Sequence, residues 1–155
     1  MNLKATIGME THVELDTKSK MFCSCEVVET DEPNISVCPT CLGLPGALPV
    51  PNKTAIEYIV MLSLGANCNI TNEGMFHRKN YFYPDLPKNY QISQFDFPVG
   101  VNGSLEIVLD EELHSVEIER VHMEEDTGKS VHIGSGRIDS ATSTLLDFNR
   151  SGIPL

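Results

Sequence analysis

Four of the five cysteines stand in two short pairs, and this spacing constrains the fold more than any other feature of the sequence. Cys23 and Cys25 form a CxC pair, and Cys38 and Cys41 form a CPTC pair that is soon followed by Gly43. Zinc binds four thiolates tetrahedrally, and short-spaced pairs on turns let two ligands reach one ion without strain. We therefore expect a structural Zn²⁺ site that uses all four positions and leaves none open for catalysis.

The sequence leaves other states of these cysteines open. Disulfides are the rival interpretation, but the N-terminal stretch MNLKATIGMETH has an acid and a histidine where a signal peptide needs an apolar run. We therefore expect a reducing compartment: the cytoplasm, or a mitochondrial or plastid matrix. An empty, degenerate site and free thiols are the remaining alternatives. Cys68 has no partner in the pattern, and we expect it to be a small core residue.

The composition excludes several classes of protein. The chain has 155 residues, of which 41% are hydrophobic, so residues 1–155 are sufficient for one domain with its own core. Its 22 Asp+Glu against 11 Lys+Arg give a net charge of −11. Such a chain is a poor autonomous RNA-binding module, because phosphate neutralisation supplies most of that affinity. The apolar runs are short, so we expect no membrane span and no membrane partner.

Hydrophobic periodicity predicts an α+β fold made mainly of antiparallel sheet. Residues 3–15 alternate between polar and apolar side chains, which is typical of a strand with one buried face. Residues 16–50 predict an irregular insertion that carries the zinc loop. Asn52 is a suitable N-cap for one long helix. We expect the buried face of this helix to comprise Ala55, Ile56, Ile59, Val60, Leu62 and Ala66.

Strand patterns continue from about residue 75. QISQFDFPV predicts a strand that ends at Pro98, and GVNG predicts a turn. SLEIVLD and SVEIERVHMEED predict an antiparallel hairpin in which Leu105, Ile107 and Leu109 share a face. STLLDFNRSG predicts a last strand that runs into a glycine-containing loop.

Two acidic segments contain the ligand types that a divalent cation prefers. Glu10, His12 and Glu14 share one face of the expected N-terminal strand, and Glu124 and Glu125 precede another acid. One or two carboxylates together with substrate phosphates suffice to bind Mg²⁺. The competing interpretation is an ordinary solvated acidic face.

Two further sets of residues are candidates for binding. Arg78 and Lys79 lie beside Tyr81 and suit phosphate binding and base stacking, although a basic pair beside core aromatic residues is the favoured alternative. Asn149 and Arg150 lead into a Ser-Gly turn that is either a binding loop or a plain surface turn. The sequence has no Walker A motif, so any use of ATP does not depend on a P-loop.

Six segments resemble those of one family: IGMETHVEL, KSKMFCSC, VCPTCLGLPGALPV, HRKNYFYPDLPKNYQISQ, VHMEEDTGK and LLDFNRSGIPL. From about residue 6 onward, the chain resembles the B subunit of the tRNA-dependent amidotransferases. The resemblance implies the N-terminal part of a cradle domain similar in fold to the catalytic domain of glutamine synthetase. It also implies a zinc loop within residues 16–50.

The resemblance implies an ATP- and Mg²⁺-dependent reaction. The side-chain carboxylate of Glu on tRNA(Gln), or of Asp on tRNA(Asn), is phosphorylated and is then attacked by ammonia. The A subunit supplies this ammonia from glutamine, and a C subunit completes a heterotrimer. The products are Gln-tRNA(Gln) and Asn-tRNA(Asn), and the enzyme is a ligase of protein biosynthesis.

Site residues follow from the matching motifs. The resemblance implies that Glu10, His12 and Glu125 bind Mg²⁺ and that Glu124 and Lys79 act with them in catalysis. The residues of the candidate binding set are Arg78, Tyr81, Asp85, Lys88, Gln91, Asn149 and Arg150. The zinc ligands implied are the four cysteines already named.

The family's sequence continues beyond IPL to complete the cradle and to add helical and tail domains that bind tRNA. We therefore expect the 155-residue chain alone to be inactive. Two other functions compete with this interpretation. One is a zinc-stabilised docking module of the same complex without catalysis of its own. The other is an unrelated divalent-metal hydrolase that uses Glu10, His12 and Glu125.

Overall fold

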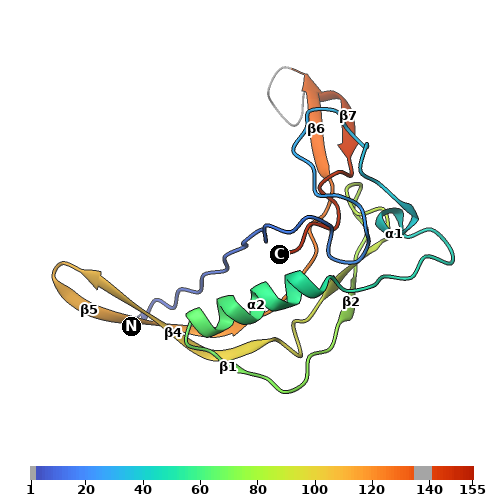
Figure 1. Cartoon of the computed structure of the whole chain (residues 1–155). Helices are drawn as coiled ribbons and strands as arrows, with labels where there is room; N and C mark the ends of the chain where they lie inside the picture. The colour runs from blue at the N-terminus through green and yellow to red at the C-terminus, as the bar shows by residue number, and fades with distance from the viewer. Residues whose placement is uncertain (1–2, 135–140) are drawn as a thin grey trace.

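The structure is a computed structural model that describes residues 3–134 and 141–155. It is mainly antiparallel sheet with few helices, which confirms the predicted class at that level (Figure 1). The elements are α1 Pro39–Leu42, α2 Lys53–Gly65, β1 Asn69–Ile70, β2 His77–Asn80, β3 Tyr90–Ser93, β4 Gly100–Leu109, β5 Glu112–Val121, β6 Lys129–Gly134 and β7 Ala141–Asp147. In the part of the chain that is described, neither helix is long and apolar enough to cross a membrane.

The long helix α2 begins where the sequence predicts. The side-chain oxygen of Asn52 accepts hydrogen bonds from the N–H groups of Thr54, at 2.9 Å, and Ala55, at 3.3 Å, which satisfies two donors that the first turn leaves free. Ala55 and Ile59 are 0% and 2% exposed and pack into the core. This end of the helix is therefore fixed both by a cap and by burial.

The far end of α2 differs from the predicted apolar face. Leu62 is 41% exposed, and Ser63 is fully buried in its place. The reason is the close approach of β4, because a Cβ added to Gly100 would lie only 2.8 Å from Cβ of Ser63. A leucine does not fit in that space, whereas the serine hydroxyl donates to the Ile59 carbonyl at 2.8 Å. Cys68, just past the helix, is buried as predicted.

The predicted hairpin is confirmed as β4 and β5, which pair from Gly100 opposite Val121 to Leu109 opposite Glu112. Its turn consists of Asp110 and Glu111, both with positive φ, as a two-residue turn between twisted strands requires. The predicted GVNG turn is wrong, because these residues form the first part of β4. Figure 1 shows this hairpin extending away from the rest of the molecule, and β1 pairs with its inner end.

The predicted strand over residues 3–15 is also wrong. Residues 3–14 are extended and exposed, and no strand in the described part of the chain pairs with them. Met9 is 89% exposed, so the segment has no buried face. A strand is stabilised by its neighbours, and alternation alone does not supply one. Pairing begins only at Leu15, whose N–H donates to the Pro154 carbonyl at 2.9 Å.

Short segments from distant parts of the chain lie side by side around the core. Ser93 pairs with Glu124, and Glu125 pairs with Pro154, both in antiparallel bridges. On the other side, the N–H of Met21 donates to the Gly152 carbonyl at 2.7 Å. The core cluster beneath comprises Leu15, Met21, Phe22, Ala55, Ile59, Ile92 and Met123. This arrangement places the second acidic segment between β3 and residues 152–155.

Candidate functional site

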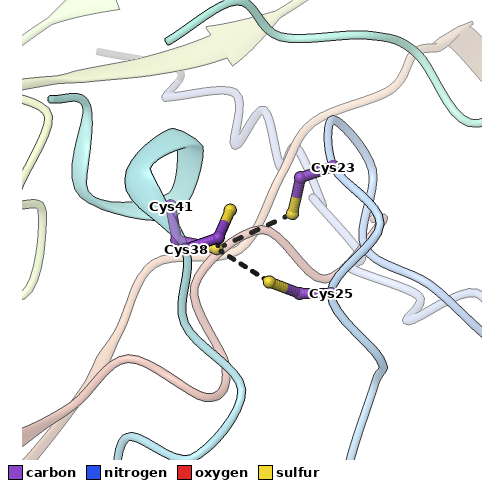
Figure 2. Close-up of side chains that lie close together, drawn as sticks. All are labelled: Cys23, Cys25, Cys38 and Cys41. Atoms are coloured by element: carbon purple, nitrogen blue, oxygen red, sulfur yellow. Dashed lines mark hydrogen bonds between the residues drawn. The ribbon is translucent and has the colours of Figure 1, made fainter. Parts of the chain in front are cut away.

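Four thiols gather at one place, as the sequence predicts (Figure 2). The sulfur atoms of Cys23, Cys25, Cys38 and Cys41 all lie within 4.8 Å of one another. Cys41 Sγ is 3.7 Å from those of Cys23 and Cys38, and 3.9 Å from that of Cys25. Sulfurs around tetrahedral zinc are about 3.8 Å apart, because each Zn–S bond is about 2.3 Å long. The cluster therefore fits zinc, and all five cysteines, which lie in the described residues, are free of disulfides.

The CPTC pair owes its geometry to the one-turn helix α1. Cys38 is extended ahead of the helix, and Pro39 suits the first helical position because no N–H is needed there. Gly43 ends the turn with φ 64°, and its N–H donates to the Thr40 carbonyl at 3.2 Å. Figure 2 shows this turn facing the loop that carries the CxC pair. Two turns thus supply two ligands each.

The thiols differ in acidity because they crowd one another. A hydrogen bond with Cys23 and, to a smaller degree, the charge of Lys20 lower the pKa of Cys41 to about 4. The same hydrogen bond, together with burial, raises the pKa of Cys23, and burial raises the pKa of Cys25 to about 11. A bound cation would supply the positive charge that the remaining thiols need in order to ionise.

Glu125 lies at the centre of a second, polar cluster. Its Oε1 accepts hydrogen bonds from the Lys88 ammonium and from the Ile92 N–H, the latter at 3.0 Å. The side chains of Lys88 and Glu125 are each 3% exposed. Gln91 Nε2 donates to the backbone oxygen of Glu125 at 2.7 Å. Buried charges need such partners, because the water that they give up must be replaced.

Glu124 is the more accessible neighbour of Glu125. Its Oε1 accepts a hydrogen bond from Ser93 Oγ at 2.8 Å and lies 3.3 Å from His122 Nε2. The hydrogen bond with His122, ahead of that with Ser93, lowers the pKa of Glu124, and the charge of Lys79 acts in the same direction. Glu124 is therefore ionised at neutral pH and is a half-buried anion beside a basic strand.

Arg150 joins the two acidic segments through residues that the site prediction did not include. Its Nε donates to Asp126 Oδ2, and its Nη2 lies 3.7 Å from Glu14 Oε1. Burial raises the pKa of Asp126, and the positive charge of Arg150 opposes that shift. The contacts of Arg150 in the structure are thus with carboxylates of its own chain.

The predicted magnesium ligands do not come together in the structure. His12 Nε2 lies 3.3 Å from Glu10 Oε1, with side chains 62% and 80% exposed. Within the described residues, the four cysteines are the only group of three or more His, Cys, Asp or Glu side chains close enough to hold a metal ion. The physical reason is that no described strand pairs with residues 3–14, while Glu125 accepts a hydrogen bond from Lys88. The assignment of Glu10, His12 and Glu125 to Mg²⁺ stays a prediction.

Arg78 and Lys79 lie on β2, and Tyr81 comes just after it. The Arg78 guanidinium lies 4.5 Å from the ring centre of Tyr90, and Lys79 Nζ lies 5.8 Å from that of Tyr81. Arg78 and Lys79 are exposed. Burial raises the pKa of Tyr81, and Asp85 and the second acidic segment raise it further, so this phenol lies near the carboxylates.

Two residues of the predicted binding set hold the backbone in place. The Asp85 carbonyl accepts from the Gly128 N–H at 2.8 Å. Asn149 is buried; its Oδ1 accepts from the Ser36 N–H at 2.9 Å, and its Nδ2 donates to the Glu32 carbonyl at 2.8 Å. The side chain of Asn149 therefore holds the cysteine loop by hydrogen bonds to its backbone and does not face solvent.

Several residues of the site were missed by the sequence prediction. Lys20 is completely buried beside the thiols, and nothing in its sequence context distinguishes it from a surface lysine. Ser93, which donates to Glu124, also carries no signal of its own. Glu14 and Asp126 belong to the two acidic segments, but only the structure shows that Arg150 links them.

The fold and the site together define a class: an α+β domain with a cluster of four thiols that fits zinc, next to a buried carboxylate–ammonium pair. Over residues 5–155, the sequence matches the family described as the GatB/GatE catalytic domain. The chain belongs to this family.

Curated relatives agree. Over 152 residues the chain is 59% identical to the B subunit of the aspartyl/glutamyl-tRNA(Asn/Gln) amidotransferase of Nocardia farcinica. It is 58% identical over 151 residues to the protein of that name from Frankia casuarinae, and 59% identical over 152 residues to that of Rhodococcus jostii. Each match covers 96% of this chain and 30% of the relative. The chain thus spans about a third of the length of these relatives.

Proposed function

We propose that this chain is part of the B subunit of a tRNA-dependent amidotransferase. The enzyme converts Glu-tRNA(Gln) to Gln-tRNA(Gln), Asp-tRNA(Asn) to Asn-tRNA(Asn), or both. The observation that carries the proposal is the family match over residues 5–155, which includes both acidic segments and the cysteine pairs. We place the protein in the bacterial cytoplasm, with an A subunit that releases ammonia from glutamine and with a C subunit.

The chemistry explains why such a site needs both anions and cations. A carboxylate is a poor acceptor for ammonia, and transfer of the γ-phosphoryl group of ATP to one of its oxygens creates a good leaving group. Phosphoryl transfer depends on positioning and on neutralising the charge of the phosphates. The exposed ammonium of Lys79, near Glu124, is suited to a nucleotide phosphate, and exposed Arg78 precedes it on β2.

Two metals belong to the proposal in different ways. The four thiols fit a structural Zn²⁺, which would tie the loop over residues 16–50 to the rest of a glutamine-synthetase-like cradle. Mg²⁺ would assist ATP by neutralising phosphate charge, but Glu10, His12 and Glu125 are not gathered among the described residues. The assignment of these three ligands stays a prediction.

The test is the amidation of mischarged tRNA by the complete heterotrimer, with ATP and glutamine. We expect Glu124→Gln and Lys79→Met to lower kcat/KM by about 100-fold or more, because each removes a charge that the reaction uses. Glu119→Gln is the matched control, since Glu119 is exposed and contacts only Arg120 among the described ion pairs. Wild-type rates in both site variants would refute the proposed roles.

A docking module without catalysis is the second candidate. The observation that favours it is the separation of Glu125 from Glu10 and His12. In the same assay, this candidate predicts that Glu10→Gln leaves the amidation rate at the wild-type value. A catalytic role predicts a loss of rate.

A further inference from the structure

Lys20 is the charged residue of the structure whose burial most needs an explanation. Its side chain is 0% exposed. None of the ion pairs found among residues 3–134 and 141–155 includes it. An ammonium removed from water is strongly unfavourable unless an anion accompanies it. Because no Asp or Glu of the described residues pairs with it, another group must supply the compensating charge.

The contacts of the ammonium identify that group. Lys20 Nζ donates to the carbonyl oxygens of Ser36, at 2.7 Å, and Phe148, at 3.1 Å. These two oxygens solvate the ammonium but carry no net charge. The third partner is Cys41 Sγ, at 3.6 Å, within the range of a hydrogen bond to sulfur. Of the three, only a thiolate at Cys41 can supply a negative charge.

The charge of a loaded site makes this contact significant. Zn²⁺ with four thiolates carries two excess negative charges, and Cys41 Sγ lies within 3.9 Å of each of the other three sulfurs. Groups that hydrogen-bond to metal ligands orient those ligands and tune the affinity for the metal. Lys20 is placed to do this for the most buried of the four cysteines.

We propose that Lys20 is a positioning residue of the zinc centre, whose ammonium compensates one excess negative charge through Cys41. The inference rests on the zinc site proposed above. Lys20 also connects the four thiols with the polar cluster around Glu125. Phe148 precedes the segment in which Gly152 packs against the Lys20 side chain, and this segment leads to the bridge between Pro154 and Glu125.

The test compares zinc affinity in variants of the complete protein, by competition with a chromogenic chelator. We expect Lys20→Met and Lys20→Gln to bind zinc about 10–100-fold more weakly, the usual cost of losing a partner of a metal ligand. Lys18→Met is the matched control: Lys18 is exposed two residues away, and its removal should leave the affinity unchanged. In cobalt-substituted protein, the thiolate-to-cobalt charge-transfer band should shift in the two Lys20 variants only.

A merely structural role gives a different result. In that case, the Lys20 variants lower the melting temperature but keep the wild-type zinc affinity and cobalt spectrum, and this outcome would overturn the inference. If both neutral variants fail to fold, Lys20→Arg decides. If the Lys20→Arg protein folds and its zinc affinity lies within about threefold of wild type, the need for a positive charge is supported. Losing the partner of a metal ligand would weaken zinc binding by more than that. If the Lys20→Arg protein does not fold, or binds zinc as weakly as a variant that has lost a ligand's partner, the proposed role of the Lys20 charge is wrong.

The same experiment separates this inference from the zinc proposal. If the wild-type protein retains no zinc, the zinc site itself is wrong and the role of Lys20 falls with it. If the wild type binds one zinc and Lys20→Met binds it equally well, only the role of Lys20 is wrong.

Discussion

At Gly43, the backbone conformation and the packing each require a residue without a side chain. Its φ is 64°, and an added Cβ would lie 2.8 Å from Cγ and 2.9 Å from Cα of Lys88. The left-handed conformation costs an ordinary residue about 1–2 kcal/mol, and the clash adds a cost of similar size. We expect Gly43→Ala to lower the free energy of unfolding by about 2–4 kcal/mol in a urea titration.

Gly46 supplies the matched control for this prediction. Its φ is 86°, but nothing lies within 4 Å of an added Cβ. Gly46→Ala should therefore show the conformational cost alone, about 1–2 kcal/mol. Equal losses for the two variants would contradict the close contact between the cysteine loop and Lys88.

Lys88 and Glu125 form a buried ion pair, so each side chain depends on the other for its charge partner. Removing one partner of a buried ion pair leaves an uncompensated charge, which typically costs about 3–5 kcal/mol. We expect that loss for Glu125→Gln and for Lys88→Met separately. The double variant should recover much of it, because no charge is then left unpaired. A double-mutant cycle from urea denaturation measures this coupling.

The surface pair of Lys53 and Glu57 is the reference for that cycle. Its side chains are 90% and 58% exposed, so Glu57→Gln should cost less than about 1 kcal/mol. Additive losses for Lys88 and Glu125, with no recovery in the double variant, would show that the pair is not coupled as described.

At the scale of elements, we expect the cysteine loop to release protons when it binds zinc. The pKa of Cys23 is raised, and that of Cys25 is raised to about 11, so both are neutral thiols at pH 7 without metal. Both must ionise to bind zinc, and at least these two protons are released. Zinc affinity should therefore fall as the pH falls. Calorimetry in buffers of different ionisation enthalpy counts the protons, and release of none would contradict the thiol protonation described here.

Local signals in the sequence predicted some elements and not others. Asn52 and the cysteine pairs act through neighbours a few residues away, so the start of α2 and the thiol cluster are both predictable. Residues 3–15 alternate like a strand, but a strand depends on a partner that alternation does not specify. Leu62 was misplaced because the approach of Gly100 from β4 decides which side of α2 is buried.

The same distinction applies to the polar cluster. The two acidic segments were visible as patterns, and Lys88 as part of a motif. That Lys88 pairs with Glu125, and that Arg150 connects Asp126 with Glu14, depends on chain segments brought together only by the fold.

At the scale of the whole molecule, the described surface exposes many large apolar side chains. On the N-terminal segment, Leu3, Ile7 and Met9 are 93%, 86% and 89% exposed. Grouped apolar surface favours association in water. We therefore expect the isolated 155-residue chain to self-associate, with a sedimentation coefficient that rises with concentration.

Substitution tests which apolar residues are responsible. Ile7→Ser together with Met9→Ser should reduce the self-association. Leu48→Ser is the control, because Leu48 is 81% exposed but lies in the cysteine loop. A concentration-independent monomer for the unsubstituted chain would show that this surface does not drive association.

Transfer of a carboxylate oxygen to phosphate would be direct evidence for the proposed function, in which the complete enzyme activates an aminoacyl carboxylate by phosphorylation. The complete heterotrimer is supplied with ATP, glutamine and Glu-tRNA(Gln) whose side-chain carboxylate carries ¹⁸O. Phosphorylation places a carboxylate oxygen between carbon and phosphorus, and attack of ammonia on that carbon expels phosphate together with this oxygen. We predict one ¹⁸O in inorganic phosphate for each amide formed, measured by mass spectrometry. Amide formation with unlabelled phosphate would rule out activation of the carboxylate by phosphorylation.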